Sequence, residues 1–507
     1  MSNTDNNKRI AKNTLMLYVR MLVLMGINFY TARVVLNALG VEDYGLYAIV
    51  GAVVIFLGFI NNSMASASQR FLAFFHGKGD LENLNRTFNS VLLVQCIISV
   101  LIFVLGETCG VLYIENYLNV SADKINVAHV VYQFSLFSFL IKTFTVPYNA
   151  SIIANERMNA FALISIVEGG LQLIAVLLLQ LVMHDRLIIY ALMMFLVVLI
   201  TQSCYRIYCV KHFKECRIRK NWDKKTVKNI FNYSGWNLLG AFSSVAIDQG
   251  VNMILNSFFG VVVNAARGIA FQVSGAIASL SGNFQQAINP QIVKSYAEGD
   301  KEKMHSMIMN GTRFCYYLLL IISIPVLFNM DALLALWLGD VPAYTVTFCR
   351  LVLINALLSA LSGSLLMGAL ATGNIKKYQI IVASINLSNL PLSYVVLCFY
   401  PNPYLTVYVM ILVSIVAFTA RLVLTSHMIN MSIKKFVIHT IIPSFYTTLV
   451  AALVVYFVNE IWSTSSLILL FVKLAVFFII VLIAVFSIGI HHNERLIIIN
   501  TVKQKIK

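Results

Sequence analysis

Lys142 and Asp248 each lie near the middle of a long apolar run of the chain, where ionisable side chains are rare. A charge in the interior of a membrane span is costly, so such residues usually face a water-filled cavity or pair with each other. Neither side chain can reach the membrane surface from the middle of a span. Two interpretations remain open: a buried ion pair between the two halves of the chain, or charges on the wall of a polar cavity.

The apolar runs contain further charged residues, and most of them are basic. The full set is Arg20, Arg33, Lys142, Arg267, Arg350, Arg421 and Lys473, against Glu168 and Asp248. Extension of the side chain to the membrane interface explains Arg350, Arg421 and Lys473, which lie near the ends of their runs. For Arg33 and Arg267, interface and cavity are both open. A cavity with this surplus of positive charge predicts an anionic ligand, and the arginine fork suits phosphate.

Hydroxyl, amide and aromatic side chains are unusually dense in three of the apolar runs, at about 14–38, 229–257 and 262–288. They are compatible with an interior that accommodates sugars. The alternative is helix–helix packing through small and polar residues.

The sequence gives little support to catalysis. It contains no DxD, HExxH, GxSxG or P-loop pattern, and its histidines are scattered. We therefore expect no catalytic residues, no metal site and no cofactor, and we exclude an ATP-driven pump formed by this chain alone.

The composition indicates that the chain carrying these charged residues is embedded in lipid. The 507 residues are 59% hydrophobic and 11% charged, whereas soluble domains carry about 25% charged residues. The apolar runs do not alternate, which favours helices over a membrane β-barrel. About fourteen spans are expected, at 14–38, 44–63, 88–106, 128–154, 160–183, 187–209, 229–257, 262–288, 312–337, 345–371, 378–399, 404–427, 436–458 and 465–489. The predicted fold class is an all-α polytopic membrane protein.

Basic residues are concentrated in alternate loops. The other loops, with the adjoining ends of the spans, hold only Lys124 and Arg186. Because basic residues favour the cytosolic side, both termini are expected in the cytosol. The net charge of +16 therefore reflects membrane topology, and nucleic acid is not expected as a partner.

An internal repeat indicates two halves of six spans each. GVEDYGLYA begins at residue 40 and GVVVNAARGIA at residue 260, and the same register aligns GKGDLENLNRTF at 77–88 with AEGDKEKMHSMI at 297–308. Asp80 and Asp300 are expected to cap the N-termini of helices there. The predicted organisation is an N-terminal six-helix bundle at 1–209, a basic cytosolic linker at 210–228, a second bundle at 229–430, and two extra helices with a cytosolic tail at 431–507.

Three motifs of the first two spans carry a resemblance to a known family: VR…FYTARVVLNALG, the acidic-aromatic turn DYGLY, and SQRF…GKGD. With these motifs the chain resembles the Wzx-type oligosaccharide flippases. They form the polysaccharide-transporter branch of the multidrug/oligosaccharidyl-lipid/polysaccharide (MOP) exporter superfamily, which is MATE-like. The duplicated halves and the extra spans extend the resemblance over the whole chain.

The resemblance implies two bundles in a V shape around a cationic cavity. The cargo would be an undecaprenyl-pyrophosphate-linked oligosaccharide, such as an O-antigen, capsule or exopolysaccharide repeat unit. It would move by alternating access from the cytosolic to the periplasmic leaflet of a bacterial inner membrane. Membrane lipids and polysaccharide assembly proteins are further expected partners.

Site residues follow from the same resemblance. Related lipid II flippases place arginines of spans 1, 2 and 8 in the cavity, and this chain has arginines on spans 1 and 8 but none on span 2 before its cytosolic end. The expected cargo-binding residues are Arg20, Arg33, Lys142 and Arg267, with Asp248 and Glu168 supplying cavity charge or coupling.

Two other functions compete with this hypothesis. A cation-coupled multidrug exporter of the same fold would favour acidic cavity residues, and only Glu168 and Asp248 are available. A membrane polysaccharide polymerase or ligase would need an outer platform for sugar chemistry, and the longest outer loop, about 107–127, is short. A non-enzyme is therefore expected.

The topology can be tested by cysteine labelling in whole cells. A cysteine introduced at position 112 is predicted to lie outside and one at position 218 inside, so an impermeant reagent should modify only the first. Modification of both positions would contradict the alternation of the spans.

Overall fold

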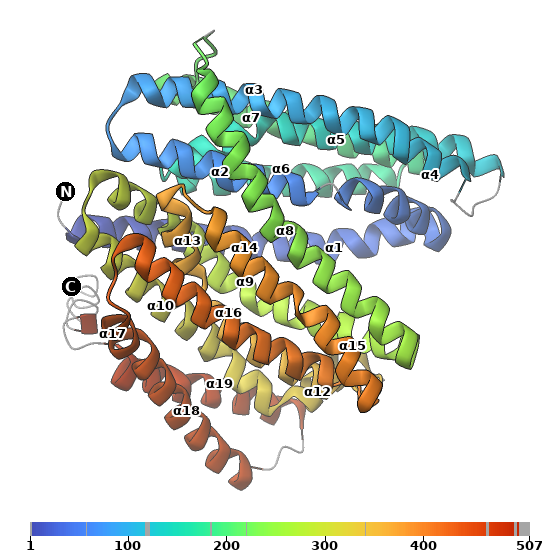
Figure 1. Cartoon of the computed structure of the whole chain (residues 1–507). Coiled ribbons are helices and arrows are strands. Elements are labelled where there is room, and N and C mark those ends of the chain that lie inside the picture. Colours follow the sequence, from blue (N-terminus) through green and yellow to red (C-terminus); the bar gives the residue numbers. More distant parts are fainter. Residues whose placement is uncertain are drawn as a thin grey trace, which may run out of the picture. The chain divides into compact units, whose positions relative to one another are not determined.

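The computed structural model of the chain describes residues 3–56, 58–116, 122–182, 185–219, 221–339, 341–462, 466–490 and 494–495. Some side chains within these ranges, that of Arg33 among them, lie outside the description, as does the predicted tail beyond residue 495. The described residues are almost entirely helical and contain no strand (Figure 1). They form two compact units: unit 1 is Met1–Phe242 with Val293–Gly299, and unit 2 is Ser243–Ile292 with Asp300–Lys507.

Unit 1 contains the helices of the N-terminal half. These are α1 (Asn3–Phe56), α2 (Gly58–Gly77), α3 (Leu81–Leu105), η1 (Gly106–Gly110), α4 (Val111–Asn116), α5 (Ala122–Ala154), α6 (Met158–Leu179), α7 (Arg186–His212), η2 (Lys214–Cys216) and the start of α8 (Lys224–Phe259). Helix α5 packs between α3 and α7, and the three run side by side in Figure 1.

Unit 2 contains the rest of α8 and most of α9 (Val261–Glu298), whose C-terminal end returns to unit 1. It continues with α10 (Lys301–Phe328), α11 (Met330–Leu338), α12 (Thr345–Ala360), α13 (Gly363–Thr372), α14 (Lys376–Leu387), α15 (Asn389–Phe399), α16 (Leu405–Ile429), α17 (Ile433–Phe436), η3 (Val437–Ile441), α18 (Ile442–Ile461), α19 (Leu467–Ala484) and η4 (Val485–Gly489).

Helices lie at every predicted span, and the prediction of an all-α polytopic membrane protein is confirmed. Among the described residues, 11 helices are long and apolar enough to cross a membrane. The predicted spans at 14–38, 44–63 and 262–288 are not in that set and lie on α1, α1 with α2, and α9.

Backbone geometry repeats at positions that the sequence register aligns. Gly40 and Gly260 have φ values of 79° and 75°, and Gly79 and Gly299 have φ values of 68° and 79°. Glycine adopts positive φ without steric cost, so it suits the end of one helix and the entry to the next.

The helices that follow Gly79 and Gly299 have equivalent N-caps. The Asp80 and Asp300 carboxylates accept hydrogen bonds from the backbone N–H groups of Asn83 and Lys303, both at 3.0 Å. The bond from Asn83 holds the pKa of Asp80 below its ordinary value, because it favours the charged form. The capping role predicted for both aspartates is confirmed.

The predicted basic linker at 210–228 packs within unit 1. The Asn85 side-chain amide on α3 donates to the Glu215 and Arg217 carbonyl oxygens at 2.7 and 3.0 Å. The compact units divide later, between Phe242 and Ser243. The boundaries at 209 and 229 come from the sequence repeat. They stay a prediction of where its first copy ends and its second copy begins.

The two extra C-terminal helices, α18 and α19, pack against α10 in unit 2. Their shared core contains Tyr317 and Leu320 of α10, Val455 of α18, and Phe477 and Val481 of α19, all of them buried. Because this core is apolar, it can hold the extra helices to the bundle by close packing.

A buried ion pair attaches the C-terminal end of α9 to the rest of unit 1. Lys294 Nζ lies 2.6 Å from Glu156 Oε1, and the two side chains are 11% and 1% exposed. The Asn13 amide donates to the Glu156 carbonyl oxygen at 3.2 Å. Gly77 permits this approach, because a Cβ at that position would lie 2.9 Å from the Lys294 backbone.

Loss of this ion pair should destabilise the protein. Lys294→Met leaves the Glu156 carboxylate buried without its cation, at a cost of about 3–5 kcal/mol. The matched control is Arg86→Met, which removes a pair with Glu82 whose side chains are 47% and 74% exposed and should cost at most about 1 kcal/mol. Unfolding of the purified proteins measures both, and equal losses would contradict the assignment.

Candidate functional site

Unit 1 encloses a cavity of about 270 Å³ between α1, α2, α5, α6 and α7. Its lining is mostly polar, and the residues are Arg20, Asn61, Asn62, Ala65, Lys142, Val146, Asn149, Phe161, Ser165, Glu168, Gln202 and Tyr205. Each of the five helices contributes one face to the lining. The cavity therefore forms only when these helices pack together. It contains three charged residues that the sequence singled out.

Those three charges leave the unit 1 cavity with one net positive charge. Lys142 Nζ lies 3.6 Å from Glu168 Oε1, beyond direct hydrogen-bond distance. The Arg20 guanidinium lies over the Phe161 ring, 4.6 Å from its centroid. A cation over an aromatic face gains electrostatic stabilisation while its N–H groups stay free to donate elsewhere.

Several polar atoms of this cavity have no hydrogen-bond partner among the described residues. They are Arg20 Nε, Asn61 Oδ1 and Asn149 Oδ1, each buried. Other lining groups are satisfied: Thr145 Oγ1 donates to Gln202 Oε1 at 2.6 Å. A buried polar group without a partner is costly, and the described residues supply no hydrogen-bond partner to these three atoms.

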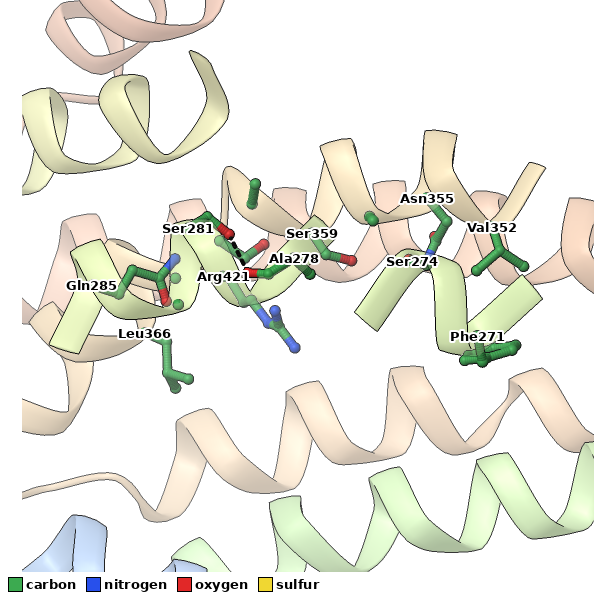
Figure 2. Close-up of a pocket in the computed structure, with 15 residues that line it drawn as sticks. Phe271, Ser274, Ala278, Ser281, Gln285, Val352, Asn355, Ser359, Leu366 and Arg421 are labelled. Atoms are coloured by element: carbon green, nitrogen blue, oxygen red, sulfur yellow. Dashed lines mark hydrogen bonds between the residues drawn. The ribbon is translucent and has the colours of Figure 1, made fainter. Parts of the chain in front are cut away.

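Unit 2 contains two adjoining cavities of about 430 and 320 Å³. They share the wall formed by Phe271, Asn355, Ser359, Ser362 and Arg421. Side chains of α9 and α12 meet Arg421 of α16 there (Figure 2). Both volumes lie in the range of small-molecule pockets, roughly 300–1,000 Å³.

Asp248 and Arg267 form an ion pair in the wall of the smaller cavity. Arg267 Nη2 lies 2.8 Å from Asp248 Oδ1, and the side chains are 6% and 47% exposed. Arg267 Nη1 donates to Asn252 Oδ1 at 2.5 Å, and the guanidinium lies 4.3 Å from the Phe271 ring centroid. Arg267 is therefore fixed on several sides, while Asp248 keeps access to the cavity.

Arg421 lines both cavities of unit 2. The sequence favours a side chain that extends to the interface, whereas the structure places this side chain on the walls of the two cavities. A signal for its position is present in α16, where Met410, Ser414, Ala417 and Arg421 follow helical spacing and all line the smaller cavity. Arg350, by contrast, forms an exposed pair with Asp331 at 2.5 Å, as expected for an interfacial residue.

The structure brings the predicted site residues together within each unit. Arg20, Lys142 and Glu168 share one cavity, and Asp248 and Arg267 share another, whereas the Arg33 side chain lies outside the described residues. Because Lys142 and Asp248 each have an oppositely charged partner in their own unit, a pair between them is not needed to explain either charge. Within the described part of the chain, no group of three His, Cys, Asp or Glu could hold a metal ion.

Comparison with solved structures identifies the fold. A MATE structure in the straight conformation superposes with a TM-score of 0.72 at 14% identity, covering 85% of this chain and 97% of that one. An outward-facing multidrug resistance MATE family transporter of the MOP superfamily gives a TM-score of 0.72 at 13% identity, covering 83% and 96%.

A third similar structure is a MOP superfamily transporter from Pyrococcus furiosus, whose description states that the reverse polarity of its binding pocket suggests a different function. Its TM-score is 0.70 at 13% identity, with 83% of this chain and 96% of that one covered. No family model matches the chain, and no curated protein sequence does.

These similarities show that the chain has a MATE-like fold, and the predicted fold of a multi-pass membrane protein is confirmed. Membership of the MOP superfamily stays a prediction. At such low identity the similarity concerns the fold alone.

Asp248 and Arg267 should be energetically coupled. Asp248→Asn and Arg267→Gln should each lower the unfolding temperature, and the double variant should be destabilised less than the sum of the two. The expected coupling is about 1 kcal/mol, since Asp248 is 47% exposed. Thermal unfolding of the four proteins gives the value, and additive effects would show that no such pair forms.

Proposed function

We propose that the protein is a flippase that moves a lipid-linked oligosaccharide from the cytosolic to the periplasmic leaflet of a bacterial inner membrane. The observation that carries the proposal is the charge of the cavities. Among the described lining residues, Arg20 and Lys142 have the single carboxylate of Glu168 beside them in unit 1, and Arg267 and Arg421 have that of Asp248 in unit 2. Each unit therefore offers a surplus positive charge to an anionic cargo.

The pyrophosphate that joins glycan to polyprenyl carrier fits this surplus. Arginine binds phosphate oxygens with two parallel N–H donors, a geometry that lysine lacks. The Arg20 guanidinium is held by an aromatic ring, and its Nε lacks a partner in the described structure. We propose Arg20 as the principal contact to the head group, with Arg33 and Lys142 assisting in the same unit, and Arg267 as a cargo-binding residue of unit 2.

Uncharged polar side chains complete the same cavities. Asn61, Asn149 and Ser165 in unit 1, and Asn355 and Ser359 in unit 2, present amide and hydroxyl groups. Amides and hydroxyls both donate and accept hydrogen bonds, as sugar hydroxyls do. A neutral polar lining beside a cationic anchor supports a cargo with an anionic head and a glycan.

The alternative is a cation-coupled multidrug exporter, and the description of one similar structure names that protein a multidrug resistance transporter. A cationic drug or coupling cation would require a carboxylate without a competing basic group. In the described cavities Glu168 and Asp248 each face a basic side chain, at 3.6 and 2.8 Å. The charge balance favours the anionic cargo over this alternative.

The proposal includes the cellular setting of the protein. Cytosolic termini follow from the distribution of basic residues, and alternating access is the transport mode that the fold suggests. Polysaccharide assembly proteins would consume the product at the periplasmic face. The chain itself would perform no chemical step.

Substitution of Arg20 tests the proposal. In cells whose only flippase is this chain, Arg20→Ala should reduce the periplasmic appearance of glycan repeats by about tenfold, because a charge-assisted contact is lost. Arg20→Lys should reduce it less, since charge remains without the fork. The control is Arg350→Ala, whose side chain lies outside the described cavities. Normal glycan assembly with Arg20→Ala at normal expression would contradict the proposed contact.

A further inference from the structure

The segment that joins α7 to α8 exposes two large apolar side chains among basic ones. Ile218 and Trp222 are 56% and 52% exposed. Glu215 is buried, so every exposed charged side chain in the described part of 213–228 is basic. These basic residues, which together with Ile218 and Trp222 we call the linker surface, are Lys214, Arg217, Arg219, Lys224, Lys225 and Lys228.

Hydrogen bonds to α3 fix the backbone beneath the linker surface. Besides the bonds that Asn85 donates, the Asn89 Oδ1 atom accepts from the Arg219 backbone N–H at 2.9 Å. The Ser90 hydroxyl accepts from the Asp223 backbone N–H at 3.3 Å, where α8 begins beside α3 (Figure 1). The exposed side chains are therefore held in position before any partner binds.

The same bonds place the linker at the depth of the membrane interface. The α3 residues that hold it straddle the start of the span predicted at 88–106. The linker also joins two further helices that are long and apolar enough to cross a membrane, Arg186–His212 and Lys224–Phe259. Because all three helices end or begin at this level, the linker lies beside lipid headgroups.

The side chains of the linker surface suit that position. Tryptophan is enriched at membrane interfaces because its ring is apolar while its indole N–H is a donor. Lysine and arginine cover apolar surface with their stems and present their charge to headgroup phosphates. Each basic group near an anionic leaflet is worth about a fivefold preference for it. An acidic protein would also complement the charge, but it would have to reach a surface at headgroup depth.

We propose that the linker surface binds anionic phospholipids of the leaflet on the predicted cytosolic side. Ile218 and Trp222 insert between the headgroups, and the basic side chains bind the lipid phosphates. This contact holds the start of α8 at the membrane surface, and α8 continues from there into unit 2. The surface is separate from the described cavities and does not depend on what the protein transports.

Quenching of Trp222 fluorescence by brominated lipids tests this contact. The full-length protein carries four tryptophans, and Trp236→Phe, Trp337→Phe and Trp462→Phe leave Trp222 as the probe. The protein is placed in phosphatidylcholine vesicles with a minor fraction of brominated lipid, either phosphatidylglycerol or phosphatidylcholine. Brominated phosphatidylglycerol should be enriched around Trp222 by about fivefold or more. Equal quenching by the two lipids, or quenching by neither, would overturn the proposal.

Charge removal shows whether the basic side chains cause the preference. Four residues of the linker surface are changed together: Arg217→Gln, Arg219→Gln, Lys224→Gln and Lys225→Gln. The preference for phosphatidylglycerol should then fall toward one. The matched control changes four exposed lysines of unit 2 and should keep the preference: Lys376→Gln, Lys377→Gln, Lys434→Gln and Lys435→Gln. A preference that survives the first set, or is lost equally in the control, contradicts the proposed contact.

Two measurements on simpler proteins cover the case in which a multiple variant does not fold. The difference in fluorescence between the unmodified protein and Trp222→Phe gives the share of Trp222. About 1 M NaCl shortens the Debye length to about 3 Å, so it should lower the preference for phosphatidylglycerol. A preference unchanged by salt would show that charge does not cause it.

The neutral aqueous quencher acrylamide distinguishes the membrane from a solvated or protein-binding surface. In vesicles that contain phosphatidylglycerol, acrylamide should quench Trp222 less than in detergent, because headgroups cover the ring. Equal quenching by acrylamide in both would overturn the proposal and leave the linker surface open to an acidic protein.

Discussion

A charged side chain surrounded by hydrocarbon must find a partner or a polar cavity, and the described interior is organised around this constraint. Unit 1 places Lys142 3.6 Å from Glu168 and stacks Arg20 over an aromatic ring. Unit 2 pairs Arg267 with Asp248 at 2.8 Å. Because charges are expensive in lipid, these residues are candidates for a functional role, and their surplus of positive charge is the feature on which the proposed anionic cargo depends.

The charged side chains of the two units are held with different rigidity. The Lys142–Glu168 pair is loose, and its lysine is 44% exposed, so a ligand can compete for either group. Arg267 is 6% exposed and also donates to Asn252, so it is held in place before any ligand arrives. One structure of the same fold is described as having a binding pocket of reverse polarity, so the fold does not determine what such a pocket binds.

The structural features that repeat in the two halves depend on residues close together in the sequence. Glycine at residues 40 and 260 has positive φ, and Asp80 and Asp300 cap equivalent helices. These features depend on residues within a turn or two, which is why the sequence pattern could predict the two aspartate caps. The length and hydropathy of the spans are local in the same sense, so the all-α membrane fold could be predicted.

The sequence could not predict which side chains pair across helices. The sequence could place Lys142 and Asp248 at mid-span, but helix rotation and packing decide that the first faces Glu168 and the second Arg267. The same holds for Arg421, whose position near a span end suggested the interface until packing of α9, α12 and α16 placed it on a cavity wall. Hydropathy fixes the depth of a residue in the membrane, whereas its neighbours depend on which faces of distant helices meet, and only the tertiary structure contains that information.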